Sequence, residues 1–317
     1  MKRLWMLGLP LCLMCFSCDS NAELLEQSGE DVQSVSVTIE EIMNEEVVSR
    51  LLPTADNLSV GLWQDNDTLG VFPSVGGQVE FPILKEDVGK TTAHFNGGGW
   101  ALKGGYSYST YYPYNYYNRD SKSVPVSYLG QKQNGNGSLE HLQRHLFYAS
   151  SPVQVKDGAL SFNLMNIGVI QQLTLTMPVA KKWSSVTVYT KTEVFPVKST
   201  INLQEEELPQ TVLSYSDRVS IKLENVSTSN PNEDIVVYMV FPFTSDDNED
   251  PLKVMVRDSE GYAYVADVKK SNGSDAYASF KKNTYQRRKA SPVLQEGMNS
   301  GISAWEQSEE DFGGTLN

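Results

Sequence analysis

The sequence predicts an all-β protein with two β-sandwich domains of the immunoglobulin- or transthyretin-like kind. Runs rich in β-branched and aromatic residues recur along most of the chain, and many alternate apolar with polar positions. This period of two is typical of half-buried strands. Clusters of Gly, Asn, Pro and Asp separate the runs at the short intervals found in sandwiches. Only residues 139–148 carry a spacing close to that of a helix, and this stretch is short.

The first residues of the chain predict an export signal. Two basic residues precede an apolar run at 4–16, which is too short to cross a bilayer as a permanent helix. Small Ser17 then lies directly before Cys18, which resembles a lipobox, where the thiol is acylated and the peptide is cut in front of it. We expect a lipoprotein signal peptide at 1–17 and a lipid anchor on Cys18 in the outer membrane. The alternative is an ordinary cleaved signal with a stray cysteine.

The remaining chain divides into a tether and two domains. Residues 18–34 are polar and rich in acidic side chains, which predicts a flexible tether. Strict alternation begins in the first expected strand, whose apolar positions are Val35, Val37 and Ile39. Because the strand-like runs form two series, we expect an N-terminal sandwich at 35–158 and a C-terminal sandwich at 159–317.

Cysteine content and charge limit what stabilises the protein and what it binds. All three cysteines fall within the first eighteen residues, so no disulfide can staple the folded part, and stability must come from apolar cores. The net charge is −13. A chain this acidic repels phosphate backbones, so we expect no nucleic-acid partner.

Few residues carry a signature of catalysis or metal binding. His141 and His145 stand four apart, the spacing of metal ligands on one helix face, but no acidic residue lies between them and a polar helix face is the better interpretation. No Gly-x-Ser-x-Gly elbow is present, and the glycines at 97–99 precede strand-like residues rather than a helix. We therefore expect no catalytic residue, no metal site and no cofactor, and we interpret the chain as not being an enzyme.

The most unusual stretch is 106–117, with seven tyrosines in twelve residues. The favoured interpretation is a strand whose tyrosines alternate between core and surface before a turn at Pro113. The other interpretation is a platform on which sugars stack, because tyrosine has an apolar face and a polar tip. Its candidate stacking residues are Tyr111, Tyr112, Tyr114, Tyr116 and Tyr117.

Two motifs resemble consecutive strands of the fimbrillin family, the subunits of type V pili and their fimbrillin-like relatives. The first reads Trp63-x-x-x-Asp67-x-x-Gly70-Val71-Phe72, and the second reads Tyr106-x-Tyr108-x-x-Tyr111-Tyr112-Pro113-Tyr114. Three further matches are residues 146–149, residues 162–173 and Trp305. The resemblance extends from residue 35 to residue 305, and its motifs mark packing rather than chemistry.

The resemblance implies an assembly mechanism. Fimbrillins are exported as lipoproteins, and an Arg-directed protease removes the tether together with the first strand. A strand from a neighbouring subunit then fills the open groove by β-augmentation. Arg50 is the only Lys or Arg between Cys18 and Lys85 and follows the first expected strand, so it is the candidate processing site. The alternative is an arginine that merely follows a strand, with Pro53 hindering a protease.

The resemblance does not decide whether the protein is a stalk, tip or accessory subunit of a pilus. Residues 306–317 hold few apolar side chains, whereas a donor strand needs an alternating apolar run. A tip or accessory subunit, which accepts a strand without donating one, is favoured over a stalk subunit. The partners would be other pilus subunits, and the location would be the surface of the outer membrane or, after polymerisation, the fimbrium. The alternative is a surface lipoprotein that never polymerises and binds a glycan or host protein through its tyrosine-rich strand.

We predict that limited trypsin treatment of the mature protein cuts first after Arg50, because that residue lies between the expected first strand and the rest of the sandwich. Mass spectrometry should find a stable fragment that begins at Leu51. A first cut inside one of the two sandwiches would remove the basis for processing at Arg50.

Overall fold

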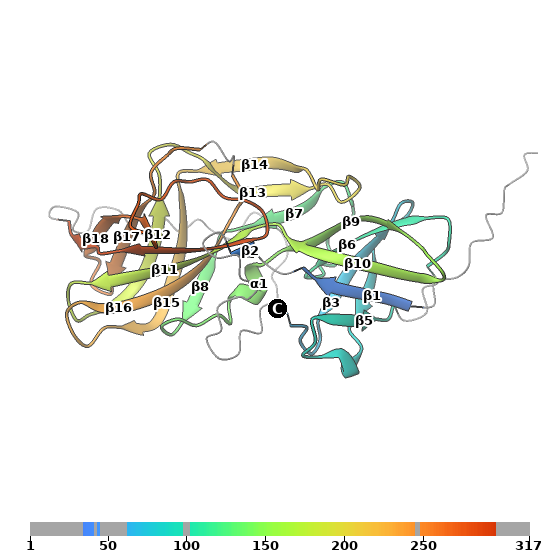
Figure 1. The fold of residues 1–317 in the computed structure, drawn as a ribbon, viewed down its shortest axis with the longest axis horizontal. Coiled ribbons are helices and arrows are strands. Elements are labelled where there is room, and N and C mark those ends of the chain that lie inside the picture. The colour runs from blue at the N-terminus through green and yellow to red at the C-terminus, as the bar shows by residue number, and fades with distance from the viewer. Residues whose placement is uncertain (1–33, 41–42, 45–61, 98–101, 245–247, 296–317) are drawn as a thin grey trace, which may run out of the picture.

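A computed structural model describes residues 34–40, 43–44, 62–97, 102–244 and 248–295 (Figure 1). Within these ranges the chain is built almost wholly of strands, with one 3₁₀ turn, η1 (Lys85–Asp87), and one four-residue helix, α1 (Leu142–His145). The predicted all-β class is confirmed. Among the described residues, no helix has the length and apolar character needed to cross a membrane.

The first sheet has seven strands in the order β4-β3-β6-β9-β10-β1-β5. It lies on the right of Figure 1. The strands are β1 (Ser34–Ile39), β3 (Thr68–Pro73), β4 (Val79–Pro82), β5 (Thr92–Phe95), β6 (Ser107–Tyr112), β9 (Tyr148–Gln154) and β10 (Ala159–Asn166).

The two outermost strands of this sheet also meet each other. Just beyond β4, Ile83 forms a bridge with Phe95 of β5. The N–H of Leu84 donates to the C=O of His94 at 2.9 Å, and the N–H of Asn96 donates to the C=O of Pro82 at 3.0 Å. The sheet is therefore closed on itself, and closure removes the unpaired edges that an open sheet presents.

Three further sheets form the other half of the molecule, on the left of Figure 1. Their orders are β16-β11-β20-β19 with β2 also on β20, β21-β18-β17-β12-β15-β8, and β14-β13-β7. The strands are β2 (Met43–Asn44), β7 (Val124–Ser127), β8 (Gln131–Asn134), β11 (Val169–Met177), β12 (Lys182–Tyr189), β13 (Phe195–Ile201), β14 (Gln210–Ser216), β15 (Arg218–Ser227), β16 (Glu233–Phe241), β17 (Lys253–Asp258), β18 (Ala263–Asp267), β19 (Lys269–Lys270), β20 (Thr284–Ala290) and β21 (Val293–Leu294).

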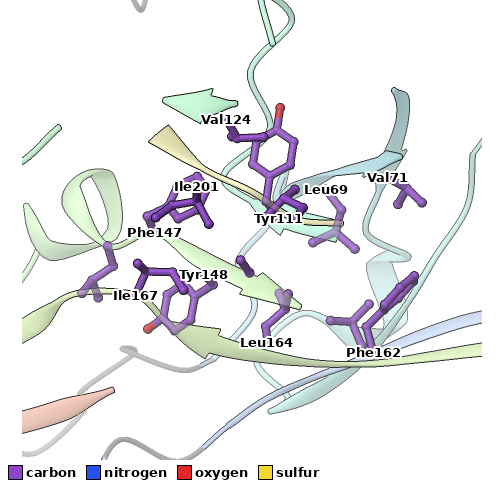
Figure 2. Close-up of a cluster of buried hydrophobic side chains, with 14 of the residues drawn as sticks. Leu69, Val71, Tyr111, Val124, Phe147, Tyr148, Phe162, Leu164, Ile167 and Ile201 are labelled. Atoms are coloured by element: carbon purple, nitrogen blue, oxygen red, sulfur yellow. The ribbon is translucent and has the colours of Figure 1, made fainter. Parts of the chain in front are cut away.

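The strands do not pair according to the division expected at residue 158. β10 follows that residue, yet it lies in the first sheet, whereas β7 and β8 precede it and pair with β13 and β15 of the other half. Two apolar cores result. The first also takes in side chains from the second half, namely Ile201 (Figure 2), Tyr238 and Tyr285. The chain crosses between the halves more than once because strand pairing, which joins residues far apart in sequence, sets the boundary.

The outer edge of β16 is closed by side chains instead of by a strand. The Gln131 amide accepts from the N–H of Val240 and donates to its C=O, both at 2.7 Å. Gln133, two residues along β8, accepts from the N–H of Tyr238 at 2.8 Å and donates to the C=O of Val236 at 2.9 Å. A primary amide offers the same donor and acceptor as a peptide group, so β8 stands in for a neighbouring strand.

Two more side chains complete this closure. The Asn136 side chain accepts from the N–H of Val236 at 2.6 Å, and Nε2 of His141 contacts the C=O of Tyr238 at 2.9 Å. The N–H and the C=O of Val236, Tyr238 and Val240, which point away from β11, thus all have hydrogen-bond partners. An edge with satisfied groups offers no template for another chain.

We predict that Gln133→Met lowers the free energy of unfolding by about 1–3 kcal/mol, because it leaves the buried N–H of Tyr238 without its acceptor. The C=O of Val236 keeps a second donor, the N–H of Gly137 at 2.9 Å. Urea unfolding measures the change. The matched control, Lys132→Met, alters an exposed ion pair on the same strand and should shift stability by less than about 0.5 kcal/mol. Equal losses in the two variants would contradict the role given to Gln133.

Candidate functional site

The candidate site is the position that β1 occupies in the first sheet. All six residues of β1 pair in parallel with β10, from Ser34 opposite Ala159 to Ile39 opposite Leu164. On its other side β1 pairs antiparallel with β5, from Val35 opposite Phe95 to Thr38 opposite Thr92. β1 is therefore an interior strand, hydrogen-bonded along both edges, although it precedes every other described strand in the sequence.

The alternation expected in this strand matches its two faces. Val35 and Val37 are 4% and 0% exposed, and Ile39 packs partly buried against the same core. The hydroxyl of Ser36 on the outer face lies 2.9 Å from that of Ser161, and Thr38 makes the equivalent contact with Thr92 at 2.9 Å. The sequence thus identified which side chains of β1 are anchored in the core.

Strand β5, which borders the site on one side, is held in place by the buried carboxylate of Asp87 in η1. Oδ2 of Asp87 accepts from the backbone N–H of His94 and contacts its ring Nδ1, both at 2.8 Å. Lys90 lies 2.5 Å from the other carboxylate oxygen. Lys90 and His94 hold the pKa of Asp87 well below its usual range. Sequence reasoning missed this residue, because nothing distinguishes one acid among many until the fold places it behind His94.

The segment that begins with β1 continues into the other half of the molecule. The N–H of Glu40 donates to the C=O of Leu164 at 2.8 Å, which extends the pairing with β10. β2 then pairs in parallel with the start of β20, Met43 opposite Thr284. The expected exchanged strand, with its apolar positions at Val35, Val37 and Ile39, is therefore only the first part of a segment that contributes to two sheets.

Loss of β1 would open the first sheet along one seam. Two fully buried valines contribute about 1.5–3 kcal/mol each, and the facing backbone groups of β10 and β5 would lose their partners on that side. Each group left buried and unsatisfied costs about 1–3 kcal/mol. These terms together are comparable with the whole stability of a domain, so the seam requires a strand. The expected lipidation site, Cys18, and the expected processing site, Arg50, lie outside the described residues.

The motif residues that carry the fimbrillin resemblance meet beside this site. The Trp63 ring is fully buried and lies 5.4 Å from that of Tyr112, whose hydroxyl donates to Asp67 at 2.7 Å. Gly70 faces Tyr111 across β3 and β6, and a Cβ at Gly70 would lie 2.2 Å from the tyrosine ring. Only glycine leaves room for this ring. The glycine of the first motif is therefore explained by packing against the tyrosine of the second.

Two of the five tyrosines proposed to stack with a ligand are not available to one, and that expectation is corrected. Tyr111 is 0% exposed and lies between Phe72 and Phe147, with ring centroids 6.0 and 5.8 Å away (Figure 2). Burial raises its pKa to about 12. The Tyr112 ring faces Trp63 and the buried Tyr148. Both residues lie on a strand whose two faces are covered, which the density of tyrosines in the sequence did not reveal.

The remaining three tyrosines lie in the loop after β6. Tyr114 is half-buried, whereas Tyr116 and Tyr117 are 61% and 64% exposed. The sequence interpretation of a strand that enters a turn at Pro113 agrees with this arrangement.

The two histidines that raised the question of a metal are held by the fold in other ways. Their rings are 6.5 Å apart, and His141 contacts the Tyr238 carbonyl. Burial lowers the pKa of His145 to about 4, with His141 and Arg144 adding to the effect. Among the residues that the structure describes, no group of three or more His, Cys, Asp or Glu side chains is arranged to hold a metal ion.

Comparison with known proteins finds similarity of fold. No protein-family model and no curated protein sequence matches the chain. A "putative cell adhesion protein" from Bacteroides uniformis is similar over 84% of this chain and 98% of its own, with 11% identity and a TM-score of 0.51. Another protein of the same description, from Bacteroides ovatus, is similar over 85% and 98%, with 12% identity and a TM-score of 0.50. At these identities the chain shares their fold, and the likeness shows no more than that.

We predict that Val37→Thr lowers the free energy of unfolding by about 1–3 kcal/mol, because it places a hydroxyl without a partner in the core at nearly constant volume. Hydrogen exchange in β10 and β5 should become faster as well. The matched control on the outer face, Thr38→Val, should change stability by less than about 0.5 kcal/mol. A larger effect from the control would mean that the inward face does not anchor β1.

Proposed function

We propose that this chain is a fimbrillin-like structural or adhesive protein of the bacterial surface, anchored through Cys18, that accepts a strand from a neighbouring subunit in place of β1. The single observation that carries this proposal is the interior position of β1 in a closed sheet. A first strand in this position is needed by the sheet, yet it comes from one end of the described chain.

The order of strands in the sequence makes β1 removable. A cut after Arg50 would separate β1 and β2 from β3 and all later strands among the described residues. The opened seam would then present the unpaired edges of β10 and β5 to any extended segment. Strand addition of this kind gains affinity from main-chain hydrogen bonds and specificity from alternate side-chain positions.

The contacts of β1 define what a replacement strand must look like. It would run parallel to β10 and carry apolar side chains at alternate positions, to replace Val35, Val37 and Ile39. Small hydroxyl residues between them would match the outer-face contacts of Ser36 and Thr38. Because residues 306–317 lack such a pattern, we propose a tip or accessory subunit that accepts a strand and does not donate one. The shared fold with Bacteroides proteins described by adhesion supports a place at the cell surface.

The test is exchange of β1 after a controlled cut. The mature protein is treated with an Arg-specific protease and mixed with excess of a fluorescent peptide of the sequence 34–44. We expect the peptide to displace the cut segment and to migrate with the protein in size exclusion, because it restores both pairings. A peptide with Val37→Asp should fail to bind, since it would bury a carboxylate in the core.

The Arg50→Ala protein is the matched control, because its first segment stays covalently attached. It should take up no labelled peptide under the same conditions. Equal uptake by the control, or no uptake by the cut protein at any peptide excess, would count against strand exchange at this site.

A further inference from the structure

The loop that follows β6 presents a cluster of side chains that packing does not use. We define the tyrosine patch as Tyr114, Tyr116, Tyr117, Arg119 and Glu80. Tyr116 and Tyr117 are 61% and 64% exposed, and their rings meet edge to face at 5.7 Å. The Arg119 guanidinium lies 4.4 Å from the centre of the Tyr116 ring. Exposed apolar surface that is gathered in one place marks an interaction site, whereas a single exposed ring needs no explanation.

The loop is held by hydrogen bonds from Tyr111, Gln78 and Asn115. The hydroxyl of Tyr111 accepts from the N–H of Asn115 at 3.1 Å and donates to Gln78 at 2.8 Å. Gln78 in turn donates to the C=O of Asn115 at 2.8 Å and to that of Tyr116 at 3.3 Å. The Asn115 side chain accepts from the N–H of Tyr117 at 2.9 Å. The exposed rings are therefore displayed by a loop whose backbone is already ordered, which lowers the entropy lost on binding.

The two charged groups of the patch, Glu80 and Arg119, differ in sign, and both act on the charge state of Tyr114. Burial raises the pKa of Tyr114, Glu80 raises it further, and Arg119 opposes both. Arg119 and Glu80 are both exposed, and no salt bridge between described residues involves either. Each keeps planar hydrogen-bonding groups for an outside partner: five N–H donors on the arginine and two acceptor oxygens on the glutamate.

We propose that the tyrosine patch binds a pyranose ring of a neutral glycan, and this rests on the adhesive part of the proposed function. The C–H face of a pyranose is apolar and fits an aromatic ring, while its hydroxyls both donate and accept hydrogen bonds. Arg119 and Glu80 supply the matching donors and acceptors. An anionic ligand is disfavoured, because Glu80 lies in the patch and the chain carries a net charge of −13.

The test uses saturation-transfer NMR on the full mature protein with lactose, cellotriose and chitotriose as neutral probes. Sialyllactose serves as the carboxylate-bearing counterpart of lactose. We expect transfer from protein to the ring C–H protons of at least one neutral probe, unchanged between about 0.05 and 0.5 M salt, because a neutral ligand has no charge to screen. Tyr116→Ala combined with Tyr117→Ala should weaken binding at least about tenfold, whereas Tyr117→Phe should retain most of it.

The matched control is Tyr215→Ala, which removes a tyrosine that is 54% exposed on β14, outside the patch, and should leave binding unchanged. The same thermal unfolding midpoint in all variants would show that the loop remains folded. Transfer that persists in the double alanine variant, transfer to sialyllactose alone, or no transfer to any neutral probe would overturn the proposal. Because the strand-exchange experiment does not involve this loop, failure of one experiment leaves the other unaffected.

Discussion

The pairing of β1 on both sides is the constraint on which the first half of the molecule depends. β10 and β5 each supply one ladder to it, and the contact between the end of β4 and β5 closes the rest of the sheet. A closed sheet has no free edge, and each of its strands is needed to keep it closed. The strand that completes the closure comes first among the described strands, so a single cut after it would break its covalent link to the other strands of the sheet.

The outer edge of β16 is satisfied in a different way. On β16, amides from Gln131, Gln133 and Asn136 satisfy the outward backbone groups directly. Side chains that replace a strand in this way cannot be exchanged without unfolding the segment that carries them. The edge of β16 is therefore not open to strand addition in the way proposed for the seam at β1.

The tyrosine-rich segment contains tyrosines that pack in the core and tyrosines that are exposed on the surface. Tyr111 packs between Phe72 and Phe147, and its hydroxyl donates to Gln78. Tyr112 packs against Trp63, and its hydroxyl donates to Asp67. The same hydrogen bonds fix the loop in which Tyr116 and Tyr117 are exposed. The rigidity of the displayed rings is therefore a consequence of the burial of the preceding ones, which explains why one short segment contains both.

Local pattern by itself determined the all-β class and the inward positions Val35 and Val37, because alternation is a local property of a strand. It could not determine the partners of β1, the role of Asp87, or the assignment of β10 and β8 to their sheets. Those depend on pairing between residues more than a hundred positions apart in several cases. Exposure of Tyr116 against burial of Tyr111 was likewise decided by tertiary structure, since identical side chains differ only in what the fold places over them.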